Sequence, residues 1–268
     1  MQQILLVLAL AYAALGAWAW LGRRRADKPY SVRGEQSVLA PLLLLHGALV
    51  LLPPFGAREL VMGFGYALCL VWWLMLMLYF GGSFFYRLNG LQLLLYPLAA
   101  ASLAAAAYFP GRHAAYQLAN LPFMLHLISA LLAYSLFAVS ALLAVLVLWL
   151  HRNLRRRRHL QQVYWLPPLL SLEKMMLQGV WAGFILLTLA VVSGTVFAEE
   201  VFRRPLQWNH KTVFGIMSWL IYALLLLRRR MTAWRGKRVA VWTIIGFVSL
   251  MTAYIGSKFV LEILLPAV

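Results

Sequence analysis

Long apolar stretches recur along the whole chain and constrain its fold more than any other feature. A helical crossing of a bilayer's hydrocarbon core takes roughly 20 apolar residues. Eight segments fit this requirement: about 2–21, 38–54, 60–80, 88–109, 122–150, 175–198, 210–227 and 239–265. The gaps between them are too short for a soluble domain. The sequence therefore predicts an all-α polytopic membrane protein, a bundle of eight transmembrane helices forming one transmembrane domain over residues 1–268.

The charged residues predict how this bundle is oriented. Only 12% of residues are charged, against 64% hydrophobic, and a soluble protein has about a quarter charged. The basic residues crowd into every second gap, at 23–33, 87, 152–174 and 228–238. Because short loops rich in Lys and Arg stay cytoplasmic, both termini are expected on the outer, periplasmic side. The basic residues that give the net charge of +17 are then a topology signal, and they also lie against anionic membrane lipid. Nucleic acid is not expected as a partner.

The first segment and the cysteine count exclude two other interpretations. A signal peptide places its positive charge before the apolar stretch, whereas here Arg23, Arg24 and Arg25 follow it. We therefore expect a retained helix with an outward N-terminus. The sequence has one cysteine, Cys69, so it contains neither a disulfide framework nor a Cys-x-x-Cys-His haem-attachment motif.

The apolar segments hold almost no ionisable residues, which are the usual indicators of function inside a membrane. The carboxylates of the first 200 residues are expected in loops or at helix ends: Asp27, Glu35, Glu59, Glu173, Glu199 and Glu200. No carboxylate is expected at mid-membrane, which argues against an ion-coupled transporter. The chain also lacks paired carboxylates and a nucleophile–base pair, so nothing indicates independent catalysis.

The histidines remain as candidates, and His46 is the one predicted at membrane depth. It lies halfway along the second apolar segment. A neutral imidazole at that depth either hydrogen-bonds a neighbouring helix or ligates a metal such as iron. The residue alone favours the hydrogen bond.

His126 and His210 form a second candidate pair. His126 lies near the start of the fifth segment and His210 opens the seventh, so the predicted topology places both at the outer face. Two imidazoles at one level, with Trp208, Phe202 and Trp181 nearby in the sequence, would suit a flat aromatic ligand with a metal centre, since imidazole is a common axial ligand of haem iron. The alternative is that these are ordinary interfacial rings at helix ends.

The sequence also resembles the cytochrome c assembly family of haem-handling membrane proteins, the CcsA-type group, and especially its shorter YpjD-like and HemX-like members. The matching elements are His126-x7-Tyr134, Gly183-Phe-Ile-Leu-Leu-Thr-Leu, Ser193-Gly194-Thr-Val-Phe-Ala198, Trp219-Leu-Ile-Tyr222, Trp234-Arg235-Gly236-Lys-Arg238 and Gly246-Phe247. The resemblance is strongest over residues 122–257. It implies haem as cofactor, with His126 as an outer histidine and His46 as a membrane-embedded one.

The chain departs from the family pattern at several ligand positions. The family's tryptophan-rich outer loop ends in Trp-Asp-Pro-Lys-Glu, and here the stretch is Trp208-Asn-His-Lys-Thr. The second outer histidine has no counterpart after Gly256, and the second membrane histidine is replaced by Leu227. His210 is a candidate to replace the missing outer ligand, with Trp208 as a stacking wall.

The sequence therefore predicts a haem-binding or haem-handling protein of a bacterial-type cytoplasmic membrane. It would act as an accessory of cytochrome c or haem-protein assembly, with a membrane protein as partner. Two alternatives stay open. One is a haem-free partner that regulates or stabilises another membrane complex, which the lost ligands favour. The other is a permease lined by the aromatic stretch Trp72–Tyr79, which at helical spacing is more typical of packing.

Overall fold

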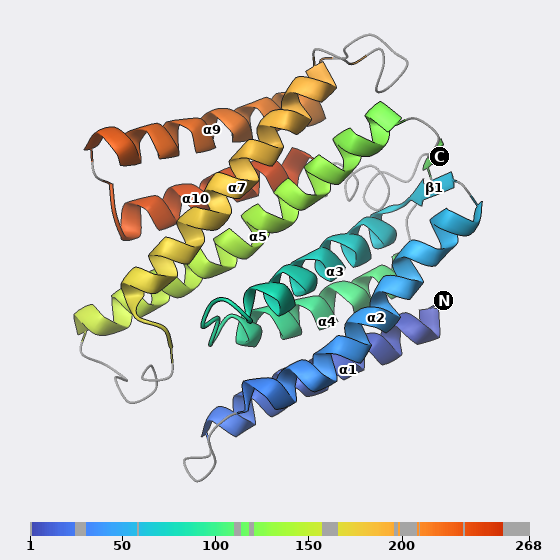
Figure 1. Cartoon of the computed structure of the whole chain (residues 1–268), viewed down its shortest axis with the longest axis horizontal. Coiled ribbons are helices and arrows are strands. Elements are labelled where there is room, and N and C mark those ends of the chain that lie inside the picture. The colour runs from blue at the N-terminus through green and yellow to red at the C-terminus, as the bar shows by residue number, and fades with distance from the viewer. Residues whose placement is uncertain are drawn as a thin grey trace. The chain divides into compact units, whose positions relative to one another are not determined.

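A computed structural model describes residues 2–24, 31–57, 59–109, 114–117, 121–156, 166–195, 198, 208, 210–232 and 234–253 of the chain. These residues form eight helices and two short strands (Figure 1). The helices are α1 (Gln2–Arg24), α2 (Val32–Ala57), α3 (Phe64–Gly82), α4 (Gln92–Tyr108), α5 (Leu121–Arg156), α7 (Leu169–Thr195), α9 (His210–Thr232) and α10 (Lys237–Met251). The strands β1 (Glu59–Met62) and β2 (Ala114–Gln117) pair in a two-stranded sheet.

The helices follow the predicted apolar segments in order, so the helical class of the fold is confirmed. Six of them are long and apolar enough to cross a membrane: α1, α2, α3, α5, α7 and α9. Helix α4 is a shorter apolar helix of 17 residues, and α10 has 15 residues within the described part of the chain. The total number of crossings and the side of each terminus remain predictions.

The structure differs from the predicted helix bounds where polar residues flank the apolar segments. Helix α2 begins at Val32, six residues before the predicted start at 38, and α7 begins at Leu169 rather than at 175. The strand β1 occupies the predicted beginning of the third segment, at Glu59–Met62. A helix continues past the hydrocarbon core wherever its backbone bonds can be made, so hydropathy alone marks the crossing and not the helix end.

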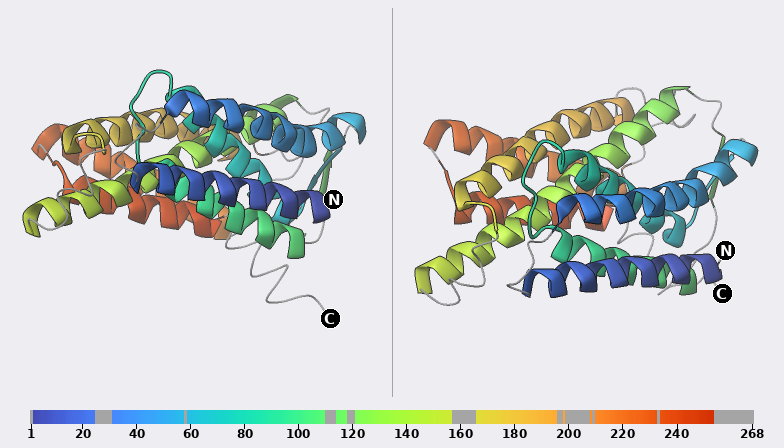
Figure 2. Two further views of the ribbon diagram at one scale, coloured as in Figure 1. Left: turned by 90° about the horizontal axis from the view of Figure 1, so that it is seen from below. Right: turned by 60° about the horizontal axis from the view of Figure 1, so that its bottom comes forward.

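Two compact units make up the chain, residues 1–116 and 117–268. In the first unit, α4 packs along α1, and α3 lies between α4 and α2 (Figure 2). Hydrogen bonds from polar side chains also join the helices, and the hydropathy pattern does not indicate them. Trp73 Nε1 donates to the carbonyl of Leu43 at 3.0 Å, and the Tyr66 hydroxyl donates to the carbonyl of Val50 at 2.8 Å. The aromatic stretch Trp72–Tyr79 thus contributes to packing. Whether the two units form one transmembrane domain stays a prediction.

The second unit is built from α5, α7, α9 and α10 (Figure 1). Helices α5 and α7 form its most extensive pair, and α10 packs against both α5 and α9. At the centre, the ring of Phe137 stacks on that of Tyr222 with centroids 3.8 Å apart. The start of α5, the end of α7 and the start of α9 lie at one end of this unit, so the candidate residues His126 and His210 belong to helix termini at the same end.

Candidate functional site

His126 is held by a side chain of the facing helix. It lies in the second turn of α5 and is half-buried. Its Nδ1 atom is 2.9 Å from the hydroxyl oxygen of Ser193 on α7. The Ser193 hydroxyl also donates to the carbonyl of Ala190 at 3.1 Å. A hydroxyl has a single proton to donate, so while Ser193 donates to Ala190 it accepts from the imidazole. In that arrangement Nδ1 carries the proton of a neutral His126 and Nε2 the lone pair; with the hydroxyl turned toward Nδ1 the two nitrogens exchange roles.

Gly194 provides the space that the His126 ring occupies. A Cβ atom added at Gly194 would lie 2.9 Å from Cε1 of His126, closer than real Cβ contacts allow. Any side chain at this position would therefore displace the imidazole or separate α5 from α7. Two elements of the sequence resemblance, His126 and Ser193-Gly194, are thus in contact although they are 67 residues apart.

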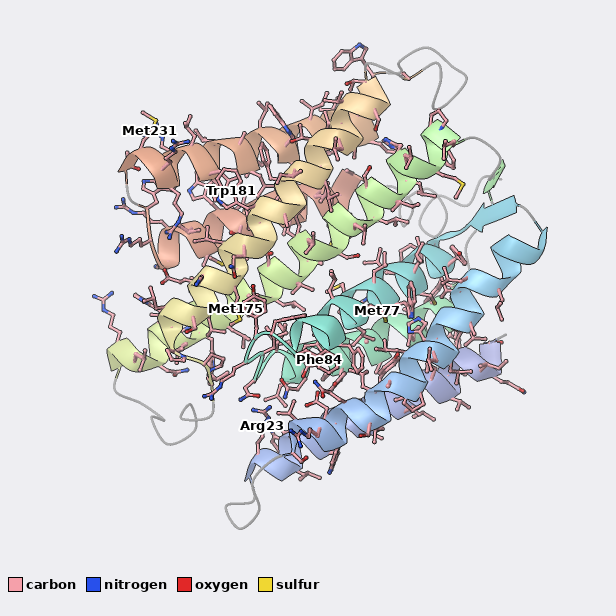
Figure 3. All side chains as sticks on the ribbon, in the orientation of Figure 1. Arg23, Met77, Phe84, Met175, Trp181 and Met231 are labelled. Atoms are coloured by element: carbon pink, nitrogen blue, oxygen red, sulfur yellow. The ribbon has the colours of Figure 1, made fainter. Side chains whose placement is uncertain are left out.

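The structure does not test the predicted partners of His126. His210 begins α9, but its side chain lies outside the described part of the structure, as does Phe202. Trp208 immediately precedes α9 and is 74% exposed. Trp181 is half-exposed near the middle of α7 (Figure 3). It lies 12 residues before Ser193, about 18 Å along a helix, so the fold does not place it beside His126.

His46 points into the interior of the first unit, which the sequence left undecided because every side of its helix is apolar. Its side chain has no exposed surface. Nδ1 lies 3.3 Å from the Tyr12 hydroxyl of α1, a long hydrogen bond. Nε2 is also buried and makes no hydrogen bond of good geometry to a described residue, although a backbone group of Cys69 on α3 lies close to the imidazole. The predicted hydrogen bond to a neighbouring helix is therefore present, and it uses one of the two ring nitrogens.

The carboxylate of Glu35 lies at a helix end, as the sequence predicted, but its burial was not predicted. It lies in the first turn of α2 and is 1% exposed. The hydroxyls of Tyr79 and Tyr96 both donate to its Oε1 atom, the former at 2.7 Å, and Gln92 Nε2 is 3.4 Å from Oε2. This cluster joins α2 to α3 and α4.

A signal for Glu35 was available in the spacing of the buried face of α2. Glu35 lies 11 residues before His46, or about three helical turns. Leu39, Leu43 and Val50 extend the same buried face. The apolar stripe of α2 therefore continues to Glu35, although the residues around it are polar.

Other elements of the resemblance pack the second unit. A Cβ atom at Gly183 would lie 3.1 Å from the ring of Phe137, and one at Gly246 would lie 2.8 Å from the ring of Tyr222. Trp219 Nε1 donates to the hydroxyl of Thr188 at 2.9 Å. These positions fix how closely α5, α7, α9 and α10 approach one another.

Comparison with known proteins gives one family. The family described as Cytochrome C assembly protein matches residues 36–265. The inner membrane protein YpjD of Escherichia coli strain K12 is 29% identical over 171 residues, 64% of each chain. The cytochrome c biogenesis protein CcsA of Prochlorococcus marinus strain SARG is 37% identical over 89 residues, which cover 33% of this chain and 28% of the relative. CcsA of Guillardia theta is 27% identical over 151 residues, about half of each chain.

The matched region thus spans less than two thirds of the length of each of these relatives. No solved structure shows a significant match to the chain.

Proposed function

Because the chain belongs to the cytochrome c assembly protein family, we propose that it binds or handles haem as an accessory of cytochrome c or haem-protein assembly. It is a multi-pass inner membrane protein, as its apolar helices and its similarity to the inner membrane protein YpjD both indicate. Family membership supports a haem-related membrane role. Haem binding, its ligands and a membrane protein partner are the finer parts of the proposal.

The observation that carries the proposal is the anchored imidazole of His126. A metal-binding histidine usually donates its second ring N–H to a neighbouring group, which fixes the tautomer and the ring orientation. His126 has this arrangement, with Nδ1 toward Ser193 and Nε2 as the atom for iron. His126 therefore fits a residue that would hold haem iron.

His210 and Trp208 complete the proposed outer site. His210 begins α9 at the same end of the second unit as His126, and is the second residue that would hold the iron. Trp208, exposed directly before α9, is the proposed stacking wall. Haem would supply the redox-active iron, and any attachment chemistry would involve its vinyl groups and a partner's thiols. The protein's own residues would hold and orient it.

His46 is the candidate ligand of a separate site in the first unit. Its buried Nε2 makes no hydrogen bond of good geometry to a described residue, and a buried polar nitrogen that is poorly satisfied is costly. Coordination would remove that cost. His46 is completely enclosed by the unit's side chains, so haem could reach it only if α1 or α3 moved away from α2.

The test is the visible spectrum of the protein purified in mild detergent, oxidised and reduced, with haem quantitation. We expect a Soret band, and sharp α and β bands on reduction, at near-stoichiometric haem. The variant His126→Ala/His210→Ala should lose the outer haem. His151→Ala is the matched control, because His151 lies at the opposite end of α5.

Unchanged haem content in the double variant would contradict the assignment of His126 and His210. A colourless protein that fails to take up added haem would favour the second candidate function, a haem-free partner of another membrane complex. The observation behind this second candidate is that Leu227 replaces one histidine expected from the family, and that no histidine follows Gly256.

A further inference from the structure

The turn between α3 and α4 exposes three aromatic side chains in a row. Phe84, Phe85 and Tyr86 are 61%, 83% and 44% exposed, and Figure 3 labels Phe84 at this turn. The proposed haem sites use none of these residues. Single exposed apolar residues are common on protein surfaces, but three adjacent rings in a connecting turn need an environment that accepts them.

The turn also differs in charge from the other gaps that are predicted to be cytoplasmic. Residues 60–111, which contain α3, the turn and α4, include one charged residue, Arg87. The other three gaps of that side, at 23–33, 152–174 and 228–238, hold five or six basic residues each, as cytoplasmic loops usually do. A position in cytoplasmic water therefore does not account for the composition of this turn.

The lengths of the two helices bring the turn toward the hydrocarbon core. Helix α3 has 19 residues and α4 has 17, which corresponds to about 29 Å and 26 Å, whereas the core is about 30 Å thick. At the other end of α4, Tyr108 and Phe109 are exposed, as is typical of aromatic rings at a membrane–water interface. With those rings at the outer interface, α4 is too short to carry the turn past the opposite headgroups.

The polar groups of the turn find partners within the protein, which a position close to hydrocarbon requires. The N–H of Gly90 donates to Oε1 of the fully buried Gln92 at 2.8 Å. The Ser83 hydroxyl donates to the carbonyl of Phe80 and accepts from Nε2 of Gln36, both at 2.6 Å. The other N–H groups that donate to carbonyls of the turn or of the end of α3 are those of Ser83, Phe84, Phe85, Tyr86, Leu88 and Leu91. These groups therefore do not depend on water.

We propose that the α3–α4 turn is inserted into the leaflet that the charge distribution predicts to be cytoplasmic, and that lipid acyl chains cover the rings of Phe84 and Phe85. In this arrangement the backbone of the turn lies at the boundary between acyl chains and headgroups. The hydroxyl of Tyr86 reaches the headgroups, and Arg87 extends its guanidinium to the lipid phosphates along its apolar stem. The inference is independent of haem binding.

The test measures the depth of the turn by spin labelling of the full-length protein in dioleoyl-phosphatidylcholine liposomes that contain no other protein. Cys69→Ser removes the native thiol, and Phe85→Cys carries the nitroxide. Leu44→Cys is the control for the hydrocarbon core, because Leu44 is 75% exposed on α2, and Arg235→Cys in an exposed basic gap is the control for water. We expect oxygen to relax the label at Phe85 more strongly than a water-soluble nickel chelate, as at Leu44, and the opposite order at Arg235.

Bilayer thickness tests the argument from helix length. Dimyristoyl-phosphatidylcholine forms a thinner core, so the nickel chelate should gain access to the label at Phe85 while the label at Leu44 stays inaccessible to it. Unchanged access at Phe85 would contradict this argument. Stronger relaxation by nickel than by oxygen at Phe85 in the thicker bilayer would overturn the proposal and place the turn in water. A label shielded from both reagents would overturn it as well, because protein rather than lipid would then cover the rings.

Discussion

Glu35 shows how one ionisable residue can organise a membrane-embedded unit. Its carboxylate accepts hydrogen bonds from Tyr79 of α3 and Tyr96 of α4, and lies near the amide nitrogen of Gln92. The amide of Gln92 in turn accepts the N–H of Gly90 in the turn before α4, at 2.8 Å. Water is excluded from this position because Glu35 is buried. Without the carboxylate the buried donors would lose their acceptor, and without the donors the buried carboxylate would lose its hydrogen bonds.

Replacing Glu35 should destabilise the first unit strongly. Glu35→Ala leaves two buried hydroxyls and an amide without their acceptor, and we expect a loss of about 3 kcal/mol or more in unfolding free energy. Glu35→Gln keeps an acceptor oxygen and should cost clearly less. Thermal unfolding in detergent provides the measurement. The matched partner is Tyr79→Phe, and the double variant should cost less than the sum of the single ones. Wild-type stability in Glu35→Ala would contradict the structural role assigned to the cluster.

Ser193 gives the second prediction for a single residue. If His126 ligates haem, its Nδ1–H needs the Ser193 hydroxyl to hold the ring in place. Ser193→Ala should lower haem affinity about 10- to 100-fold, the usual cost of removing a hydrogen bond behind a metal ligand. Haem titration followed by the Soret band measures it. Ser129→Ala is the control, since that hydroxyl donates to the carbonyl of His126 and not to its ring. Equal affinities of the two variants would argue against His126 as a ligand.

At the scale of the helix, two glycines predict opposite outcomes of the same substitution. Gly246 of α10 lies under the ring of Tyr222 on α9, and an added Cβ would approach it to 2.8 Å. Among the described residues, no atom lies within 4 Å of a Cβ added at Gly215 of α9. Gly246→Ala should therefore destabilise the second unit by about 1–3 kcal/mol through overpacking. Gly215→Ala should be neutral or stabilising by up to about 1 kcal/mol, because alanine favours a helix.

Both glycine variants can be compared by thermal unfolding in one detergent. Because the two substitutions have the same chemistry, a difference between them reports packing alone. Destabilisation by Gly215→Ala to the same extent as by Gly246→Ala would show that α9 and α10 do not approach as described.

The helices themselves were largely predictable, because a helix that crosses the hydrocarbon core needs a continuous apolar stretch of about 20 residues. Their ends were not. Helix α2 starts at Val32 because Arg33, Glu35 and Gln36 continue the helix beyond the apolar segment, and Glu35 then finds its donors on other helices. The strand β1 replaces a predicted helix start. Pairing of β1 with β2 links residues about 55 positions apart, and no local pattern in the sequence encodes such a contact.

The candidate site was predictable only in part for a related reason. A histidine near a helix start is visible in the sequence, and His126 is in fact oriented toward the interior of its unit. Its anchor, Ser193, lies on another helix, and nothing in local spacing connects the two. The left-handed Gly236 and its bond to Glu173 are equally non-local. The sequence thus indicates candidate ligands, whereas the residues that hydrogen-bond to them are seen only in the fold.

At the scale of the whole molecule, the alternation of basic gaps predicts which side of the membrane each loop occupies. Helix α9 provides the sharpest test, since its candidate membrane span Lys211–Thr232 measures about 33 Å, enough to cross the hydrocarbon core, and carries its arginines near one end. Trp208 precedes it and Thr232 ends it, and both are exposed. The native Cys69 is buried and can be replaced by serine to give a background without thiols.

We predict that a cysteine introduced by Trp208→Cys reacts with a membrane-impermeant maleimide in intact spheroplasts, and that one introduced by Thr232→Cys reacts only after the membrane is permeabilised. The physical reason is the cost of moving Arg228, Arg229 and Arg230, which lie at the end of this mostly apolar helix, across the bilayer. The reverse pattern would invert the topology and place the Trp-Arg-Gly-Lys-Arg turn in the outer leaflet. Labelling of both cysteines in intact spheroplasts would mean that α9 does not span the membrane, and His210 would then no longer be separated from the basic turn by a bilayer.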